Sequence, residues 1–393
     1  MKKMIKLSLV AAVAVAGLTT SASAQKLTDA IQGVDFSGSV EYRMEHRDTE
    51  TKNAIVPAAS TNGENAKIVL KGKTSVNDSV TFSTVAVVNG QAASQGDSVA
   101  STQGAANINV AKFTYTNGAL NVTAGMQELN TPWTSAGDGA RANGILATYG
   151  LGSVTLAGAM FRDAQQGIYT NVATNSANIN AVAALGSAGP IHYAVWYAMI
   201  NEENDATAML GNNRGGLDAL SIALGGKFGP VSVDASYATL EEDGATVLNG
   251  KLLDQSLAKV MLAADLGAVK LTAGMADGGK DGELVSFSTT NSSAMFESWN
   301  VSAGDGTGSN LSAYTLRADM PVGPVSIALQ YTDAEFDDNY GNTIATLDAD
   351  VNEVMAQVTY KMSKNFTTYF RYAQVDTKIT TKATGVTTGT DMD

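Results

Sequence analysis

Residues that could act as acids, nucleophiles or metal ligands of the usual enzyme types are scarce in this chain of 393 residues. The chain has 2 histidines, His46 and His192, and no cysteine. A chain without cysteine has no disulfide scaffold, thiol nucleophile, iron–sulfur cluster or Cys-ligated zinc. No Gly-x-Ser-x-Gly nucleophile elbow occurs, and neither histidine lies in a recognisable catalytic motif. These residue types predict that the protein is not an enzyme and that it carries no cofactor.

Two short segments approach ligand-binding motifs without completing them. Gly274–Lys280 follows a phosphate-loop spacing, but Asp281 stands where Ser or Thr should reach the magnesium ion. Asp348 and Asp350 begin like a calcium loop that lacks its sharp-turn glycine and its distal glutamate. We interpret both segments as polar loops exposed to solvent.

The first 24 residues have the pattern of a secretory signal peptide. Lys2, Lys3 and Lys6 precede an apolar stretch over Leu7–Leu18, and small residues at 22–24 form the cleavage site. The alternative, an N-terminal membrane anchor, would need a longer apolar stretch of about 20 residues. Cleavage leaves residues 25–393 with 22 basic and 38 acidic residues, a net charge of −16. Such acidity argues against nucleic acid as a partner, because nucleic acid requires a basic face.

The mature sequence is dominated by apolar residues at every second position. Val34, Phe36, Val40 and Met44 alternate with polar residues, and the stretch 66–73 repeats the pattern. This period predicts strands with one apolar and one polar face. No later apolar run reaches the length of a spanning helix, so crossing a membrane would require a closed β-barrel.

Short turns and long polar segments follow one another along the chain. Asn117-Gly118 is a strong hairpin signal, and Gly-Pro followed by a β-branched residue recurs at 189–191, 229–231 and 323–325. Short turns at one end and long loops at the other are typical of outer-membrane barrels. The sequence therefore predicts a single all-β domain, a transmembrane antiparallel β-barrel in the outer membrane of a Gram-negative bacterium.

The strand count and the end of the chain suggest an unfinished barrel. About seventeen alternating segments are present, whereas single-chain bacterial barrels have an even number of strands. Residues 376–393 read as a polar loop, so we expect about 18 strands with the last one missing. A C-terminally incomplete chain would leave a gap one strand wide between the strands 34–45 and 366–375.

Charged residues within the strands must face the interior. A Lys or Arg facing lipid at mid-bilayer costs roughly 2–4 kcal/mol, and several would exceed a domain's usual net stability of roughly 5–15 kcal/mol. We expect aromatic residues near the strand ends, among them Phe113, Trp196 and Phe370, to form interfacial girdles. The basic residues predicted to line a water-filled lumen are Arg43, Lys67, Lys71, Lys73, Arg317 and Arg371.

The third long loop and the mature N-terminus carry a family resemblance. Residues 125–130 (Gly-Met-Gln-Glu-Leu-Asn), Trp133-Thr134 and Asp138-Gly139 resemble the Campylobacter-type major outer membrane porins, as does Tyr42-Arg43 in the first strand. The resemblance implies an eighteen-stranded homotrimeric porin whose third loop folds into the lumen. It also implies a channel for cations and hydrophilic solutes, with a calcium ion in some members. In this chain Glu128 and Asp138 are the matching positions for calcium.

These observations together predict a porin for the passive diffusion of ions and small hydrophilic solutes, embedded in outer-membrane lipid. The third loop, residues 128–142, is expected to narrow the pore with Glu128, Trp133, Asp138 and Arg141, facing the basic wall. The acidic mature chain predicts a weak cation preference. The alternatives are a surface or adhesive protein whose barrel only displays loops, a solute-specific channel, and a third loop that stays outside the pore.

Overall fold

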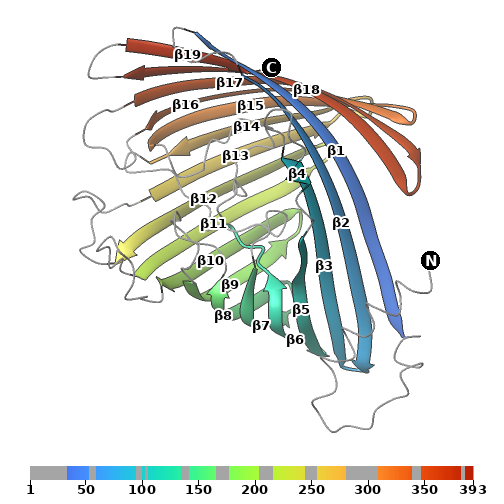
Figure 1. Ribbon diagram of the computed structural model, residues 1–393. Coiled ribbons are helices and arrows are strands. Elements are labelled where there is room, and N and C mark those ends of the chain that lie inside the picture. Colours follow the sequence, from blue (N-terminus) through green and yellow to red (C-terminus); the bar gives the residue numbers. More distant parts are fainter. Residues whose placement is uncertain are drawn as a thin grey trace.

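The strands of this chain form one continuous antiparallel sheet that closes on itself (Figure 1). The computed structural model describes residues 33–52, 59–93, 100–101, 105–133, 141–164, 177–202, 216–243, 255–279, 309–338, 347–381 and 386–392. Each long strand pairs with the long strands before and after it, and β19 pairs with both β18 and β1. The fold is therefore the antiparallel β-barrel that the sequence predicts.

Seventeen of the described strands have nine residues or more, while β4 has two and β19 has seven. The strands are β1 (Val34–Lys52), β2 (Ala59–Asn77), β3 (Val80–Ala93), β4 (Ala100–Ser101), β5 (Ala105–Asn117), β6 (Leu120–Glu128), β7 (Arg141–Leu151), β8 (Val154–Ala164), β9 (Ala177–Ala188), β10 (Ile191–Glu202), β11 (Gly216–Phe228), β12 (Val231–Asp243), β13 (Gln255–Asp265), β14 (Lys270–Gly278), β15 (Ser309–Val322), β16 (Val325–Asp338), β17 (Leu347–Ser363), β18 (Phe366–Thr381) and β19 (Val386–Met392).

The two faces of the sheet differ as the period-two pattern predicts. On β1 the side chains of Val40 and Met44 are 78% and 71% exposed, and large exposed apolar side chains continue on the same face around the sheet. Charged residues such as Arg43 occupy the opposite face, because successive side chains on a strand point to opposite sides. The apolar face suits lipid and the charged face suits a wet lumen. Among the described residues, no helix is long and apolar enough to cross a membrane.

Tight turns join the strands at one end of the sheet. The hairpin predicted at Asn117-Gly118 joins β5 to β6, and Gly118 has a φ of 58°, which favours glycine. The three Gly-Pro turns connect β9 to β10, β11 to β12 and β15 to β16. The connections at the other end lie largely outside the described residues. The long loop predicted over 46–64 is shorter than expected, because β1 runs to Lys52 and β2 begins at Ala59.

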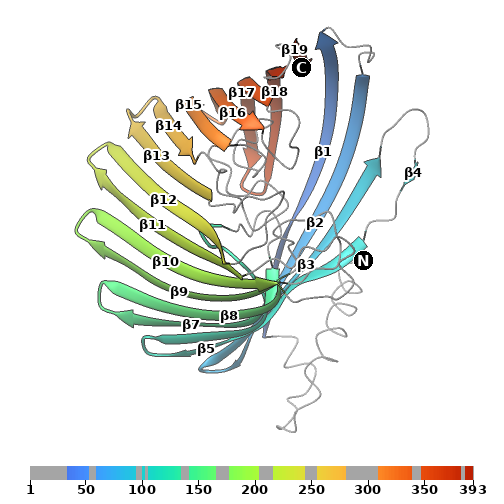
Figure 2. The same cartoon turned by 90° about the vertical axis from the view of Figure 1, so that its left-hand side faces the viewer.

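The closing seam of the barrel differs from the prediction in one respect and agrees in another. The expectation that residues 376–393 hold no strand is wrong: β18 runs to Thr381, and β19 returns antiparallel to it. However, β19 pairs with β1 only over Thr49–Lys52. As expected, residues 34–45 and 366–375 do not pair directly, since β1 and β18 share no pairing in the described sheet and diverge there (Figure 2).

Candidate functional site

The described ion pairs on the lumen face involve Arg43 on β1, Arg317 on β15, and His192 of β10 with Asp234 of β12. The Arg43 guanidinium lies between two carboxylates of its own strand, donating to Glu41 at 3.1 Å and to Glu45 at 3.1 Å. These contacts are largely exposed, so they add little to stability. They do neutralise Arg43 locally and leave this part of β1 with an excess of negative charge.

Lysines dominate the lumen face of β2. Cross-strand pairing sets Lys67 opposite Glu41, Lys71 opposite Ser37, and Lys73 opposite Asp35. All three predicted wall lysines therefore share the face that carries Arg43. We use the term charged wall for the lumen-facing residues of β1, β2 and β5.

Sequence analysis missed a fourth lysine of the charged wall. Lys112 on β5 lies opposite Ser83 of β3, which in turn lies opposite Lys73. A register shift between Val85 and Ala86 interrupts the alternation on this side of β5. Strict alternation along β5 therefore does not predict whether Lys112 faces the lumen or the outside.

The other predicted basic residues lie in networks on the last long strands. Arg317 donates to Asp319 at 2.8 Å and to Gln330 at 3.1 Å, and Gln330 donates to Thr332 at 3.2 Å. Arg371 donates to Gln357 at 2.7 Å and lies over the ring of Tyr369, 5.7 Å from its centroid.

The opposite part of the lumen face is apolar and buried over the loop-end half of the strands. We call this cluster the apolar wall; it consists of Leu129, Trp133, Ala142, Phe161, Ile179, Ala198, Ala219, Ala238, Leu240, Leu257, Ala276, Leu311, Ala313 and Ala334. Trp196 packs against it from the lumen face of β10, so its predicted place in an interfacial girdle is wrong. The even positions of β10 face inward, because Val195, Tyr197 and Met199 are exposed on the other face.

The start of the third long loop packs onto the apolar wall. Leu129 and Trp133 follow the end of β6 and are only 4% and 1% exposed. Such burial inside the sheet means that the chain turns inward after Glu128. The alternative in which Trp133 lies at an external rim does not fit this position.

The four residues predicted to form the constriction are not all brought together. Glu128 pairs with Arg141 across β6 and β7, on the face of Ile145, which is exposed to the outside. Alternation thus directs Glu128 and Arg141 away from the lumen, and Arg141 donates to Asn109 at 2.8 Å. Trp133 lies inward, and Asp138 lies outside the described residues.

The predicted calcium site involves Asp138, which lies outside the described residues, so calcium binding stays a prediction. No group of three or more His, Cys, Asp or Glu residues within the described ranges could hold a metal. Glu128 is the cross-strand partner of Arg141, on the outer face of the sheet. Asp350, from the incomplete calcium motif, lies in a strand and accepts from Lys378 at 3.3 Å. We therefore assign no metal chemistry to these residues.

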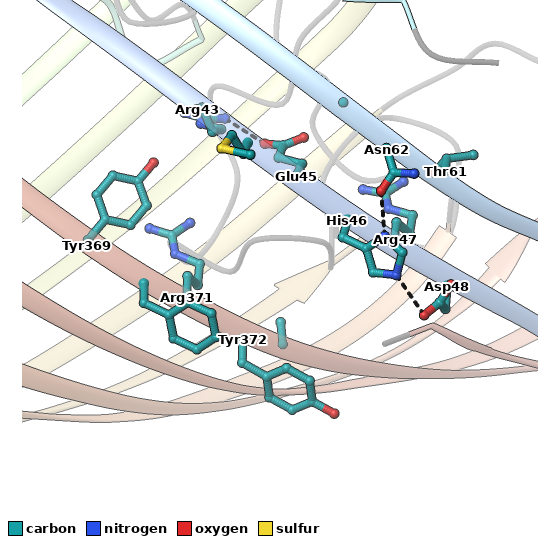
Figure 3. A pocket seen from close by; sticks show the side chains of 14 residues that line it. Arg43, Glu45, His46, Arg47, Asp48, Thr61, Asn62, Tyr369, Arg371 and Tyr372 are labelled. Carbon is teal, nitrogen blue, oxygen red and sulfur yellow. Dashed lines mark hydrogen bonds and ion pairs between the residues drawn. The ribbon is translucent and has the colours of Figure 1, made fainter. Parts of the chain in front are cut away.

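A cavity of about 590 Å³ opens at the seam between β1 and β18. Residues 43–48 line one side and residues 369–373 the other (Figure 3). Both strands pair with β19 just above this point, so their edges diverge by one strand width. We call this cavity the seam slot.

His46 lies at the upper end of the seam slot, beyond the outward apolar positions of β1 that end at Met44. Its ring nitrogens are 2.7 Å from Asn62 Oδ1 and 3.0 Å from Asp48 Oδ2 (Figure 3). The hydrogen bond to Asn62, followed by that to Asp48, raises the pKa of His46 above its ordinary value. The second histidine, His192, contacts Asp234 at 2.8 Å near the turn end of the lumen.

Comparisons with known proteins place this geometry among outer-membrane channels. Residues 1–391 match a family described as Campylobacter major outer membrane protein. No curated protein sequence matches the chain.

Several solved porin structures share the fold. A BenF-like porin from Pseudomonas fluorescens Pf-5 has a TM-score of 0.62 and 11% identity over 91% of this chain and 97% of its own. OccK2 (OpdF) of Pseudomonas aeruginosa has a TM-score of 0.64 and 11% identity over 92% and 96%. OccAB4 of Acinetobacter baumannii has a TM-score of 0.60 and 11% identity over 91% and 96%. At such identities the likeness shows the fold alone.

Proposed function

This chain belongs to the Campylobacter major outer membrane protein family, and we propose that the start of its third long loop narrows the channel. The protein is an outer-membrane porin that passes small solutes. Solutes move passively through such a lumen, driven by their own gradients. Within this function, the narrowing of the channel is what the described residues of this chain support.

The observation that carries the proposal is the inward burial of Leu129 and Trp133. A segment that leaves β6 and packs its tryptophan onto the apolar wall occupies part of the lumen cross-section. The remaining water path then runs along the charged wall, where Arg43, Lys71 and Lys73 lie. Charges on one side of a narrow path act on passing ions, because salt screens them only over about 10 Å at 0.1 M.

Planar bilayer recordings of the purified protein test this function. We expect stepwise openings in the wild-type protein, and larger steps when Trp133→Ala releases the segment from the apolar wall. A protein that inserts without stepwise openings would instead act as a surface or adhesive barrel. Unchanged conductance in a folded Trp133→Ala variant would place the narrowing elsewhere.

Two further features of the proposal concern selectivity and assembly. The predicted mature charge of −16 favours a weak preference for cations, opposed by the lysines of the charged wall. A homotrimer follows from the family resemblance. Reversal potentials in a KCl gradient test the first feature, and light scattering of the detergent-solubilised protein tests the second; clear chloride preference or a monomer would overturn the respective expectation.

A further inference from the structure

We propose that Lys71, Lys73 and Lys112 form a binding patch for small organic anions with more than one carboxylate. This inference rests on the proposed channel function, because the patch faces the lumen and a ligand must reach it through the pore. It adds a solute class that the mature chain's negative charge does not suggest.

The register of the sheet brings the three lysines together. Lys73 of β2, Ser83 of β3 and Lys112 of β5 occupy one cross-strand row. Neighbouring strands are about 4.8 Å apart, so the Lys73 and Lys112 backbones are about 10 Å apart with the Ser83 hydroxyl between them. Lys71 follows on the same face of β2, about 7 Å from Lys73 along the strand.

Lys71 and Lys73 are exposed, and Lys112 is half-buried. Lys112 lies between Ser83 and Gly125, and Lys71 lies between Ser37 and Val85. A Cβ at Gly125 would approach the Lys112 backbone closely, and Gly125 has a φ of 123°, so a larger residue is disfavoured there.

The three lysines differ from the lumen arginines in their partners. Arg43, Arg317 and Arg371 are held by acidic or amide groups. Within the described part of the chain, no hydrogen bond or ion pair involves Lys71, Lys73 or Lys112. The carboxylate directly opposite any of them is that of Asp35, across from Lys73. The patch therefore keeps a net positive charge.

The spacing of the lysines favours a particular ligand class. Ammonium groups on flexible stems, anchored about 7–10 Å apart, can contact two carboxylates of one molecule at once. Hydroxyls extend the row on the next strands, where Thr114 and Thr123 lie 3.1 Å apart on the lumen face. These hydroxyls can donate to the remaining carboxylate oxygens. A monocarboxylate would use only one of these contacts.

The experiment measures block of single-channel current by citrate, with acetate as the monovalent probe. We expect citrate added at the turn end to reduce wild-type conductance at concentrations at which acetate has no effect. The triple variant Lys71→Gln, Lys73→Gln, Lys112→Gln should raise the half-blocking concentration by about tenfold or more, because neutral amides replace charged donors to the carboxylates and such charge-assisted hydrogen bonds are the stronger ones. Replacing the same lysines by arginine should retain the block.

The matched control changes the same net charge near the same end of the barrel, on strands outside the patch. It combines Lys227→Gln, Lys270→Gln and Lys361→Gln, on β11, β14 and β17. Block retained in this control supports a defined site, whereas equal relief in both glutamine triples would overturn it in favour of overall charge. Stepwise wild-type openings that citrate does not reduce would overturn the inference alone; absence of any openings would overturn the channel function itself.

Discussion

The charged wall and the apolar wall lie on the same sheet, but they differ in how far their side chains are buried. The apolar wall buries Trp133, Phe161 and Leu240 and holds the start of the third loop in place. The charged wall leaves Lys71 and Lys73 exposed, and its first strand is partly unpaired at the seam slot. We therefore expect substitutions on the apolar wall to change stability most, and substitutions on the charged wall to change ion conduction.

The largest expected effect is on the apolar wall. Trp133→Ala should lower the free energy of unfolding by about 3–5 kcal/mol, because it removes a buried aromatic side chain and leaves a cavity. Urea unfolding in phospholipid vesicles, followed by circular dichroism, measures this. Ser39→Ala on the charged wall is the control, expected within about 0.5 kcal/mol of wild type. Similar losses in both variants would contradict the division between the walls.

The seam can be tested with cysteine pairs, since the chain has no cysteine of its own. Thr49 and Met392 are direct partners of β1 and β19, so Thr49→Cys with Met392→Cys should form a disulfide that stabilises by about 2–4 kcal/mol. Arg47→Cys with Ala373→Cys spans the seam slot and should stay reduced, because β1 and β18 do not pair there. Non-reducing electrophoresis distinguishes the pairs, and efficient oxidation of the second pair would show that the seam closes.

The hydrogen-bond network next to the apolar wall should show an intermediate effect. Gln330 is buried and accepts from Arg317 while donating to Thr332. Gln330→Ala should lower the free energy of unfolding by about 1–3 kcal/mol, because two buried partners lose a hydrogen bond. A loss no larger than that of Ser39→Ala in the same urea series would show that this network contributes as little to the free energy of unfolding as the charged wall does.

A substitution on the charged wall should change the ion selectivity and leave the free energy of unfolding nearly unchanged. Arg43→Gln removes one positive charge that lies between Glu41 and Glu45. A unit charge about 10 Å from the ion path contributes roughly 0.4 kcal/mol in water, with opposite sign for cations and anions, so the cation-to-anion permeability ratio should rise by up to about fourfold. Reversal potentials measure this ratio. An unchanged ratio would mean that the ion path does not pass Arg43.

The smallest expected effect concerns pH at the upper end of the seam slot. The pKa of His46 is raised in the folded protein, so its stabilising contribution is complete below the ordinary pKa of 6.5. That contribution is lost as the pH rises through the raised pKa. Wild type should therefore lose slightly more stability than His46→Gln between pH 6 and pH 8 in urea unfolding. The opposite ordering would show that folding lowers the pKa of His46.

Much of the barrel could be predicted because alternation and turn chemistry are local signals. The hairpin at Asn117-Gly118 and the apolar face of β1 follow from a few neighbouring residues. The last strand could not be recognised, because β19 is short and its threonines and glycine read equally well as a loop. Lys112 was not predicted as a lumen residue for a different reason: the register shift beside it is set by pairing with β3.

The sequence by itself determined the class of fold, the polarity of each face and the inward direction of the predicted wall lysines and arginines, because these follow from period two and the cost of charge in lipid. Tertiary structure decided which lumen residues meet. Trp196 lies inside although its type suits a girdle, and Glu128 lies opposite Arg141 on the outer face although its loop turns inward. Such placements depend on register between strands far apart in the chain, and no local pattern encodes that register.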